Sequence, residues 1–188
     1  MPPRGRDRDE VLAALGEVFR EHGFDGASLA LISERTGLGK GSLYHAFPGG
    51  KEEMATAVLA EIDAWFATHV FRPLRGDKDP RQAIAHMLQA VDTYFRSGRR
   101  LCLVGVLALG DARDRFGQQV SAYFLAWREA LADAFMRMGH DGDDALSLAE
   151  DTVAAIQGAL ILARAMPDMG AFTRMRARLE TRLLAGPK

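Results

Sequence analysis

The chain has 188 residues, 48% of them hydrophobic, and a formal net charge of -1. A chain of this size can bury one good core, or one core and a small satellite domain. Its single cysteine, Cys102, excludes an internal disulfide framework and a multi-cysteine zinc site. The longest uninterrupted apolar tract, which begins at Leu101, is about half the length of a membrane-spanning helix, and the first residues lack a signal-peptide core. We therefore expect a cytoplasmic protein that makes no membrane contact.

Three short helices are predicted at the N-terminus. Apolar residues recur at helical spacing over residues 7–22, which predicts an amphipathic helix that ends at Gly23. Ser28 is a good N-cap for a second helix, which Gly37 ends. A third short helix is predicted over residues 40–47. The tight turn before it is typical of a helix-turn-helix motif, whose second helix lies in the DNA major groove.

The third predicted helix is rich in residue types that bind DNA. From Arg35 to Lys51 the chain has no acidic residue. Gly39 and Gly41 would each cost about 1 kcal/mol relative to alanine inside a helix, but they would let the backbone approach a duplex closely. Cationic and hydroxyl groups in this segment can reach base edges or phosphate oxygens. The candidates of this kind are Lys40, Ser42, Tyr44 and His45.

Two alternatives remain open for this N-terminal region. A run of positive charges is also typical of a solvated helix face, and Tyr44 and His45 could complete a small core. Arg4, Arg6 and Arg8 precede the first helix. They could form an arm in the minor groove, or they could belong to an ordinary solvated terminus.

The rest of the chain is predicted to be helical as well. A long helix begins at Lys51, and a domain boundary is expected inside it, which gives domains over residues 1–52 and 53–188. Asp79 can cap the next helix and Pro80 can start it. The further helices are predicted over roughly 80–97, 101–110, 113–138, 143–166 and 168–184. The expected fold class is all-α, with a helix-turn-helix domain followed by a helical ligand-binding and dimerisation domain.

Aromatic, soft and polar residues are interspersed among the apolar positions of the C-terminal half. Together they could line a mostly apolar cavity with a few polar groups, although plain core packing is the alternative for each of them. A lone cysteine between leucines is typical of a small buried hydrophobe rather than a redox switch. The histidines lack metal-ligand spacing, so neither a metal nor another cofactor is expected. The ligand candidates are Trp65, Met87, Tyr94, Cys102, Phe116, Tyr123, Phe124, Trp127 and Gln157.

The stretch GFDGASLALISERTGLGKGSLYHAFPGGKEEM, which begins at Gly23, resembles the DNA-binding domain of the TetR family of one-component bacterial repressors. The shared features are a glycine and aromatic pair after helix one, a hydroxyl cap, a glycine and aliphatic pair in the turn, and later tyrosine, phenylalanine and lysine residues. The residues that the resemblance implies to contact phosphates are Ser28, Tyr44, His45 and Lys51. Those that it implies to lie nearest the bases are Lys40, Gly41 and Ser42.

The C-terminal half carries a second resemblance. The tracts CLVGVLALG and AIQGALILARAMPD are similar to the branch of the family around lincomycin-responsive and flavonoid-responsive repressors. The last two predicted helices also have more apolar surface than one subunit's core needs. The resemblance implies that they pair with their twofold copies in a homodimer.

These features together predict a repressor that binds a palindromic double-stranded operator and is released by a small apolar or aromatic effector. A regulator that answers to no small molecule, or that activates transcription, is the first alternative. A small all-helical enzyme is the second. The sequence shows no phosphate loop, no metal spacing and no nucleophile beside a base, so we do not expect an enzyme.

Overall fold

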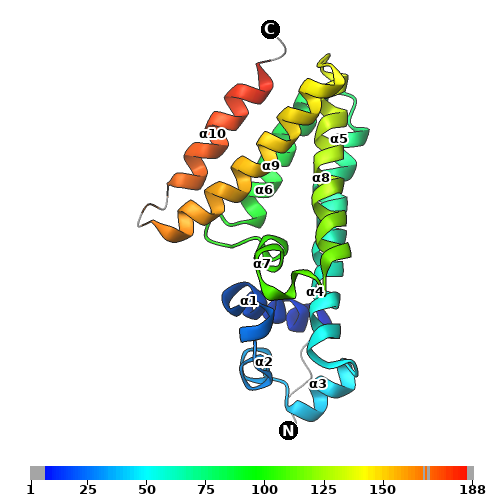
Figure 1. The fold of residues 1–188 in the computed structure, drawn as a ribbon, viewed down its shortest axis with the longest axis vertical. Coiled ribbons are helices and arrows are strands. Elements are labelled where there is room, and N and C mark those ends of the chain that lie inside the picture. Colours follow the sequence, from blue (N-terminus) through cyan, green and yellow to red (C-terminus); the bar gives the residue numbers. More distant parts are fainter. Residues whose placement is uncertain (1–6, 167, 169, 186–188) are drawn as a thin grey trace. The chain divides into compact units, whose positions relative to one another are not determined.

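The computed structural model describes residues 7–166, 168 and 170–185, and these residues form helices and turns without any strand (Figure 1). The predicted all-α fold class is confirmed. The chain divides into two compact units. The first contains the chain up to Asp63 together with Leu103–Val120, and the second contains Ala64–Cys102 and the chain from Ser121 onward. A segment from the middle of the chain therefore folds with the N-terminal helices.

The first three helices of unit 1 lie where the sequence predicts them. Helix α1 spans Arg8–Gly26, and its backbone leaves the helical conformation at Gly23 (φ 67°). Helix α2 spans Leu29–Thr36, and its N-cap Ser28 accepts a hydrogen bond at Oγ from Leu31 N at 3.2 Å. Gly37 ends α2 with a left-handed backbone (φ 70°), a conformation that glycine adopts without steric cost. Helix α3 spans Lys40–Ala46.

The core of unit 1 is built from the apolar faces of these helices and from two further elements. Helix α4, Gly50–Phe66, begins in this unit, and helix α7, Leu103–Leu109, packs against α1. A short 3-10 turn, η2, follows over Asp111–Arg113. Leu43 and Phe47 are each only 1% exposed, so α3 is anchored from its inner side.

Helix α4 continues without a break into unit 2. A π-helical turn, η1, covers Ala67–Phe71 and leads directly into α5, Arg72–Gly76. The remaining helices of unit 2 are α6 (Pro80–Tyr94), α9 (Gly142–Ala165) and α10 (Ala171–Leu184), together with most of α8 (Gly117–Arg137). Helix α10 packs on both α9 and α6. Large aromatic rings fill this core, and those with less than 2% exposure are Phe66, Phe95, Trp127, Phe135 and Phe172.

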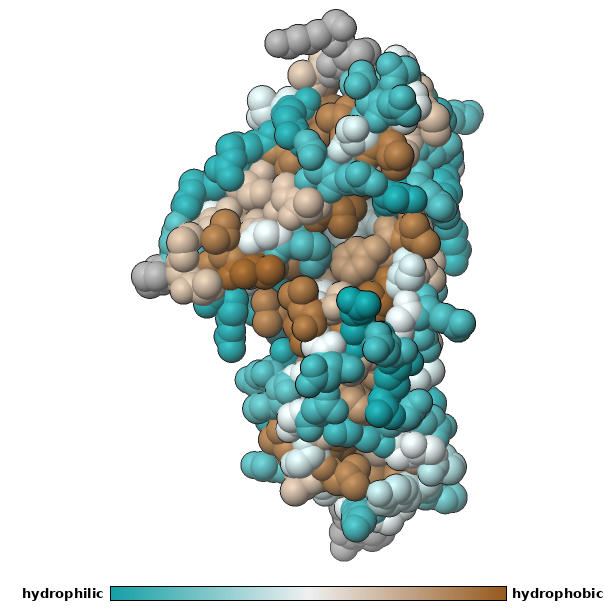
Figure 2. Space-filling model, in the orientation of Figure 1, coloured by the Kyte–Doolittle hydropathy of each residue, from teal (hydrophilic) through white to brown (hydrophobic). Residues whose placement is uncertain are grey.

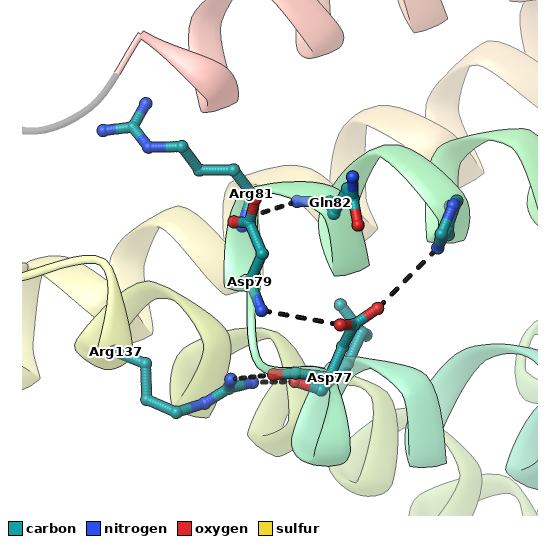
Figure 3. A network of polar contacts seen from close by, with 7 residues as sticks. Asp77, Asp79, Arg81, Gln82 and Arg137 are labelled. Carbon is teal, nitrogen blue, oxygen red and sulfur yellow. Dashed lines mark hydrogen bonds and ion pairs between the residues drawn. The ribbon is translucent and has the colours of Figure 1, made fainter.

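A polar network joins the turn between α5 and α6 to the end of α8 (Figure 3). Asp79 caps α6 as predicted, because its Oδ1 accepts hydrogen bonds from Arg81 N at 2.9 Å and Gln82 N at 3.4 Å. Arg137 of α8 donates to the carbonyl of Asp77 at 2.8 Å and also to the carbonyl of Leu74. Arg137 therefore holds the α5–α6 turn in place by donating hydrogen bonds to two backbone carbonyls.

Helix α6 ends earlier than the predicted residue 97. Three successive residues after its end have positive φ angles, namely Arg96 (51°), Ser97 (54°) and Gly98 (90°). A Cβ atom on Gly98 would lie 2.7 Å from Phe172 Cβ and 3.1 Å from Ala163 Cβ. Only glycine fits there, because this tight turn brings the backbone directly against α9 and α10.

Candidate nucleic-acid interface

Helix α3 presents one polar face to solvent. Lys40, Gly41, Ser42, Tyr44 and His45 are all exposed, whereas the apolar residues of the helix face the core. The structure thus brings together the five α3 residues that the sequence singled out. Cationic, hydroxyl and imidazole groups can donate hydrogen bonds to phosphate oxygens or base edges.

The two glycines at the start of α3 are not needed by the fold. Gly39 has an ordinary extended backbone, with φ -65° and ψ 158°, and Gly41 has no positive φ. No atom lies within 4 Å of the position that a Cβ would take at either residue. Neither turn geometry nor packing therefore requires glycine, and both sites leave the backbone open to a surface outside the chain.

Lys51 lies in the first turn of α4, close to α3. Its Nζ is 4.5 Å from the ring centroid of Phe24 and 3.5 Å from the carbonyl oxygen of Asp25. The position of a Cβ on neighbouring Gly50 would be 3.7 Å from the Tyr44 ring, so Tyr44 and the start of α4 are adjacent. In the described part of the chain no carboxylate lies within ion-pair distance of Lys51. Its ammonium can therefore meet a phosphate without first breaking a salt bridge.

The other cations near this face differ from the expectation. Arg35 pairs with Glu21 at 2.5 Å, so it does not offer a free charge as the acid-free run suggested. The carboxylate partner, Glu21, lies fourteen residues before Arg35 in the sequence and therefore outside the acid-free segment. Arg8 begins α1 with its guanidinium 5.4 Å from the ring centroid of Phe47, whereas Arg4 and Arg6 lie outside the described residues. Ser28 is exposed, and its hydroxyl caps α2 while keeping its own proton to donate.

The aromatic ligand candidates of unit 2 gather around Phe66, the last residue of α4. Its ring centroid lies 4.9 Å from that of Tyr94, 5.0 Å from Tyr123 and 5.3 Å from Trp127. The ring centroids of Trp65 and Tyr94 are 4.5 Å apart, with the two ring planes tilted by 40°. These rings form a continuous aromatic cluster. Such a cluster is compatible with the binding of an apolar or planar ligand and equally with ordinary core packing.

The remaining ligand candidates are placed differently. Met87 is fully buried and Cys102 is 6% exposed, as expected of core residues. Gln157 is half-buried on α9, and its Nε2 has no hydrogen-bond partner. Phe116 lies in unit 1, with its ring centroid 5.2 Å from that of Phe24. Phe124 packs edge-on against Tyr123 and is half-buried.

Two polar groups that the sequence did not single out lie beside Lys51 in unit 1. Arg115 donates from NH1 to Glu52 at 2.7 Å, and its guanidinium carbon is 5.3 Å from the Phe24 ring centroid. No local pattern could have found this pair, since the two residues are 63 positions apart. Among the described residues no group of histidine, cysteine and carboxylate side chains could hold a metal ion.

Comparison with known proteins identifies both halves of the chain. Residues 11–58 match the family described as "Bacterial regulatory proteins, tetR family". Residues 80–178 match "Transcriptional regulator LmrA/YxaF-like, C-terminal domain". An uncharacterized helix-turn-helix regulator of Mycobacterium tuberculosis is 29% identical over 96% of this chain and 94% of its own length. The regulator YxaF of Bacillus subtilis is 26% identical over 89% of this chain and 90% of its own length.

Solved structures agree with these matches. The TetR family regulator CifR, in a complex with a 26-base-pair operator duplex, is 29% identical, with a TM-score of 0.76 over 98% of this chain and 100% of that one. A TetR regulator from Legionella pneumophila shares the fold at 21% identity, with a TM-score of 0.78 over 96% of this chain and 98% of that one. The predicted family and branch are confirmed. The chain belongs to the TetR family of transcriptional regulators, and its C-terminal domain is of the LmrA/YxaF-like type.

Proposed function

We propose that this protein is a cytoplasmic repressor that binds a palindromic operator as a homodimer and is released from it by a small apolar or aromatic effector. The observation that carries the proposal is the exposed polar face of α3, which holds Lys40, Ser42, Tyr44 and His45 beside a glycine that packing does not require. The complex of CifR with operator DNA supports it, because the match covers 98% of this chain and 100% of the CifR chain.

The residues of this face have different roles in the proposal. Four groups near the helix ends bind phosphates, namely Ser28, Tyr44, His45 and Lys51. They set the affinity and not the sequence preference, because phosphate contacts carry little sequence information. Lys40, Gly41 and Ser42 lie nearest the base edges and set sequence preference. We assign DNA binding to residues 1–52, and effector binding and dimerisation to residues 53–188.

The second half of α9 supports the homodimer. Large apolar side chains there remain uncovered in the single chain, with Ile161 53%, Leu162 50% and Met166 41% exposed. Figure 2 shows apolar side chains gathered at the surface over this end of α9. Nothing lies within 4 Å of a Cβ placed on Gly158, which leaves room for the close approach of another helix. Pairing of α9 and α10 with their copies would remove this apolar surface from water.

Helix α9 is also the one helix of the described chain that is long and apolar enough to cross a membrane, by length and composition only. Two acidic residues of α9 form ion pairs with neighbouring helices, which favours packing against protein over insertion into a membrane. Glu150 pairs with Arg128 of α8 at 3.3 Å, and Asp151 pairs with Arg182 of α10 at 3.5 Å. Such ion pairs would be costly in hydrocarbon. We therefore assign the uncovered face of α9 to a second copy of the chain.

The effector is proposed to bind in unit 2, at the aromatic cluster around Phe66. Trp127 Nε1 and Gln157 Nε2 are among the buried donors of this unit that have no hydrogen-bond partner. Unpaired buried donors are rare in folded proteins, and a ligand that supplies an acceptor is one way to satisfy them. We propose that Trp65, Met87, Tyr94, Cys102 and Tyr123 complete the wall of the site.

An activator is the second candidate function. FasR of Mycolicibacterium smegmatis, described as a transcriptional activator, is 33% identical over 50% of this chain. The position of the bound site relative to the promoter separates the two functions. Repression requires a site that overlaps the region where the polymerase binds.

Selection of genomic fragments bound by the purified protein tests the proposal. We expect a twofold-symmetric site with half-sites about one helical turn apart, roughly 34 to 36 Å. Sizing in solution should show a dimer with and without DNA. A library of aromatic and lipophilic compounds should then contain at least one that binds and lowers operator affinity by roughly 5- to 150-fold. If compounds bind but none changes operator affinity, the ligand-independent regulator replaces the sensor.

A further inference from the structure

Two cations lie against the ring of Phe24 in unit 1. The ammonium of Lys51 is 4.5 Å from the ring centroid, and the guanidinium carbon of Arg115 is 5.3 Å from it. Phe24 is itself held in place, because its ring packs edge-on against Phe116 at 5.2 Å. Cations are attracted to the faces of aromatic rings. The buried ring of Phe24 therefore helps to hold both cationic groups close to it.

The two cations differ in their partners. Arg115 donates from NH1 to the carboxylate of Glu52 at 2.7 Å. Lys51 is next to Glu52 in the first turn of α4, yet it has no carboxylate partner within the described residues. Without Arg115, the carboxylate of Glu52 would be an uncompensated negative charge at the position next to Lys51, whose ammonium is proposed to meet a phosphate.

Arg115 also comes from an unexpected part of the chain. It lies within residues 80–178, which match the LmrA/YxaF-like C-terminal domain. Its segment, Leu103–Val120, nevertheless folds with the N-terminal helices. Helix α8 begins immediately after it, at Gly117. A residue of the C-terminal family domain therefore touches the turn that carries Lys51.

We infer that Arg115 is a positioning residue of the operator interface, which neutralises Glu52 and so keeps the Lys51 ammonium available for a phosphate. This role rests on the proposed function, because it requires that Lys51 meets DNA. The Arg115 and Glu52 side chains are 50% and 56% exposed. An exposed ion pair contributes little to folding stability, so the pair is expected to act on DNA binding rather than on the fold.

A charge-matched set of variants tests this role on a duplex that the wild-type protein selects from genomic fragments. Arg115→Gln is expected to bind this duplex about tenfold more weakly, because the uncompensated carboxylate of Glu52, next to Lys51 in the chain, now repels phosphate. The slope of log affinity against log salt should fall by about two units, one phosphate contact per subunit of the dimer. Arg113→Gln removes the same charge two positions away, from a side chain that is 71% exposed, and should bind within about twofold of wild type. Arg115→Gln combined with Glu52→Gln should restore both affinity and slope to nearly wild-type values.

Three results would overturn the inference. A double variant as weak as Arg115→Gln would mean that Arg115 contacts DNA itself. An equal loss in Arg113→Gln would mean that only the total charge matters. Tenfold weaker binding by Glu52→Gln alone would contradict the proposed cost of its carboxylate, and this variant remains informative if Arg115→Gln fails to fold. A wild-type protein that selects no duplex is a different result, because it overturns the proposed function as a whole.

Discussion

Substitution of Gly41 by alanine should make the protein more stable and a poorer DNA binder at the same time. Gly41 is the second residue of α3, and no atom lies within 4 Å of the position of the added Cβ. The methyl group therefore costs nothing inside the chain. Replacement of glycine by alanine in a helix stabilises it by up to about 1 kcal/mol, which corresponds to roughly 2 to 4 °C in Tm for a chain of this size.

The same methyl group should weaken operator binding. If the backbone of α3 lies against base edges, an extra carbon on each of the two reading helices holds it away. A loss of about 1.4 kcal/mol already lowers affinity tenfold, so we expect at least a tenfold loss. Gly142→Ala is the matched control, because Gly142 is the first residue of α9 and is equally open. That variant should gain stability without losing affinity.

The assay combines thermal unfolding with fluorescence anisotropy of a labelled duplex that the wild-type protein has selected. Both variants are measured at the same protein concentration and the same salt, since affinity for DNA depends steeply on salt. A Gly41→Ala protein that is more stable and binds as tightly as wild type would refute the argument. The glycine would then have no explanation in either folding or DNA approach.

Four further predictions concern single residues. Lys51→Ala should lower the slope of log affinity against log salt by about two units on one selected duplex, and an unchanged slope would remove Lys51 from the phosphate contacts. Leu162→Asp should convert the dimer to monomer in sedimentation at micromolar concentration, whereas Leu109→Asp, at a side chain that is 82% exposed, should leave it dimeric. Gly98→Ala should lower the free energy of unfolding by about 2 to 4 kcal/mol, because alanine must adopt a positive φ and displace a packed ring; a denaturant titration that shows no loss would contradict this. Gln157→Trp should abolish the response to any compound that releases the wild-type protein, with operator affinity of the free protein unchanged; an unaltered response would exclude Gln157 from the effector site.

Local signals predicted the elements that local chemistry determines. Ser28 caps α2, Gly37 ends it and Asp79 caps α6, as the sequence indicated. Each of these signals acts within one helical turn, so the flanking residues alone are enough to recognise it. The face of α3 followed from the same kind of reasoning, because Leu43 and Phe47 are spaced to point inward.

Features that depend on distant residues could not be predicted. The pair of Glu21 and Arg35 joins two helices, and the pair of Glu52 and Arg115 joins segments far apart in the chain. The early end of α6 depends on residues with positive φ that are not glycine, Arg96 and Ser97, and no propensity rule identifies these. The burial of Trp127 next to Phe66 is likewise a property of packing, and periodicity alone gives only the inward direction of each ring.

The two-part construction of unit 1 limits how this regulator can be recombined with others. An exchange of the DNA-reading module at a single joint would leave Leu103–Val120 of one parent facing the helices of another. The foreign segment would then present the wrong side chains to α1, which packs against α7 in the native chain. A functional chimera needs two joints, so that Leu103–Val120 travels with the N-terminal helices. In evolution the same constraint ties changes in the N-terminal helices to changes in a segment that begins forty positions after Asp63.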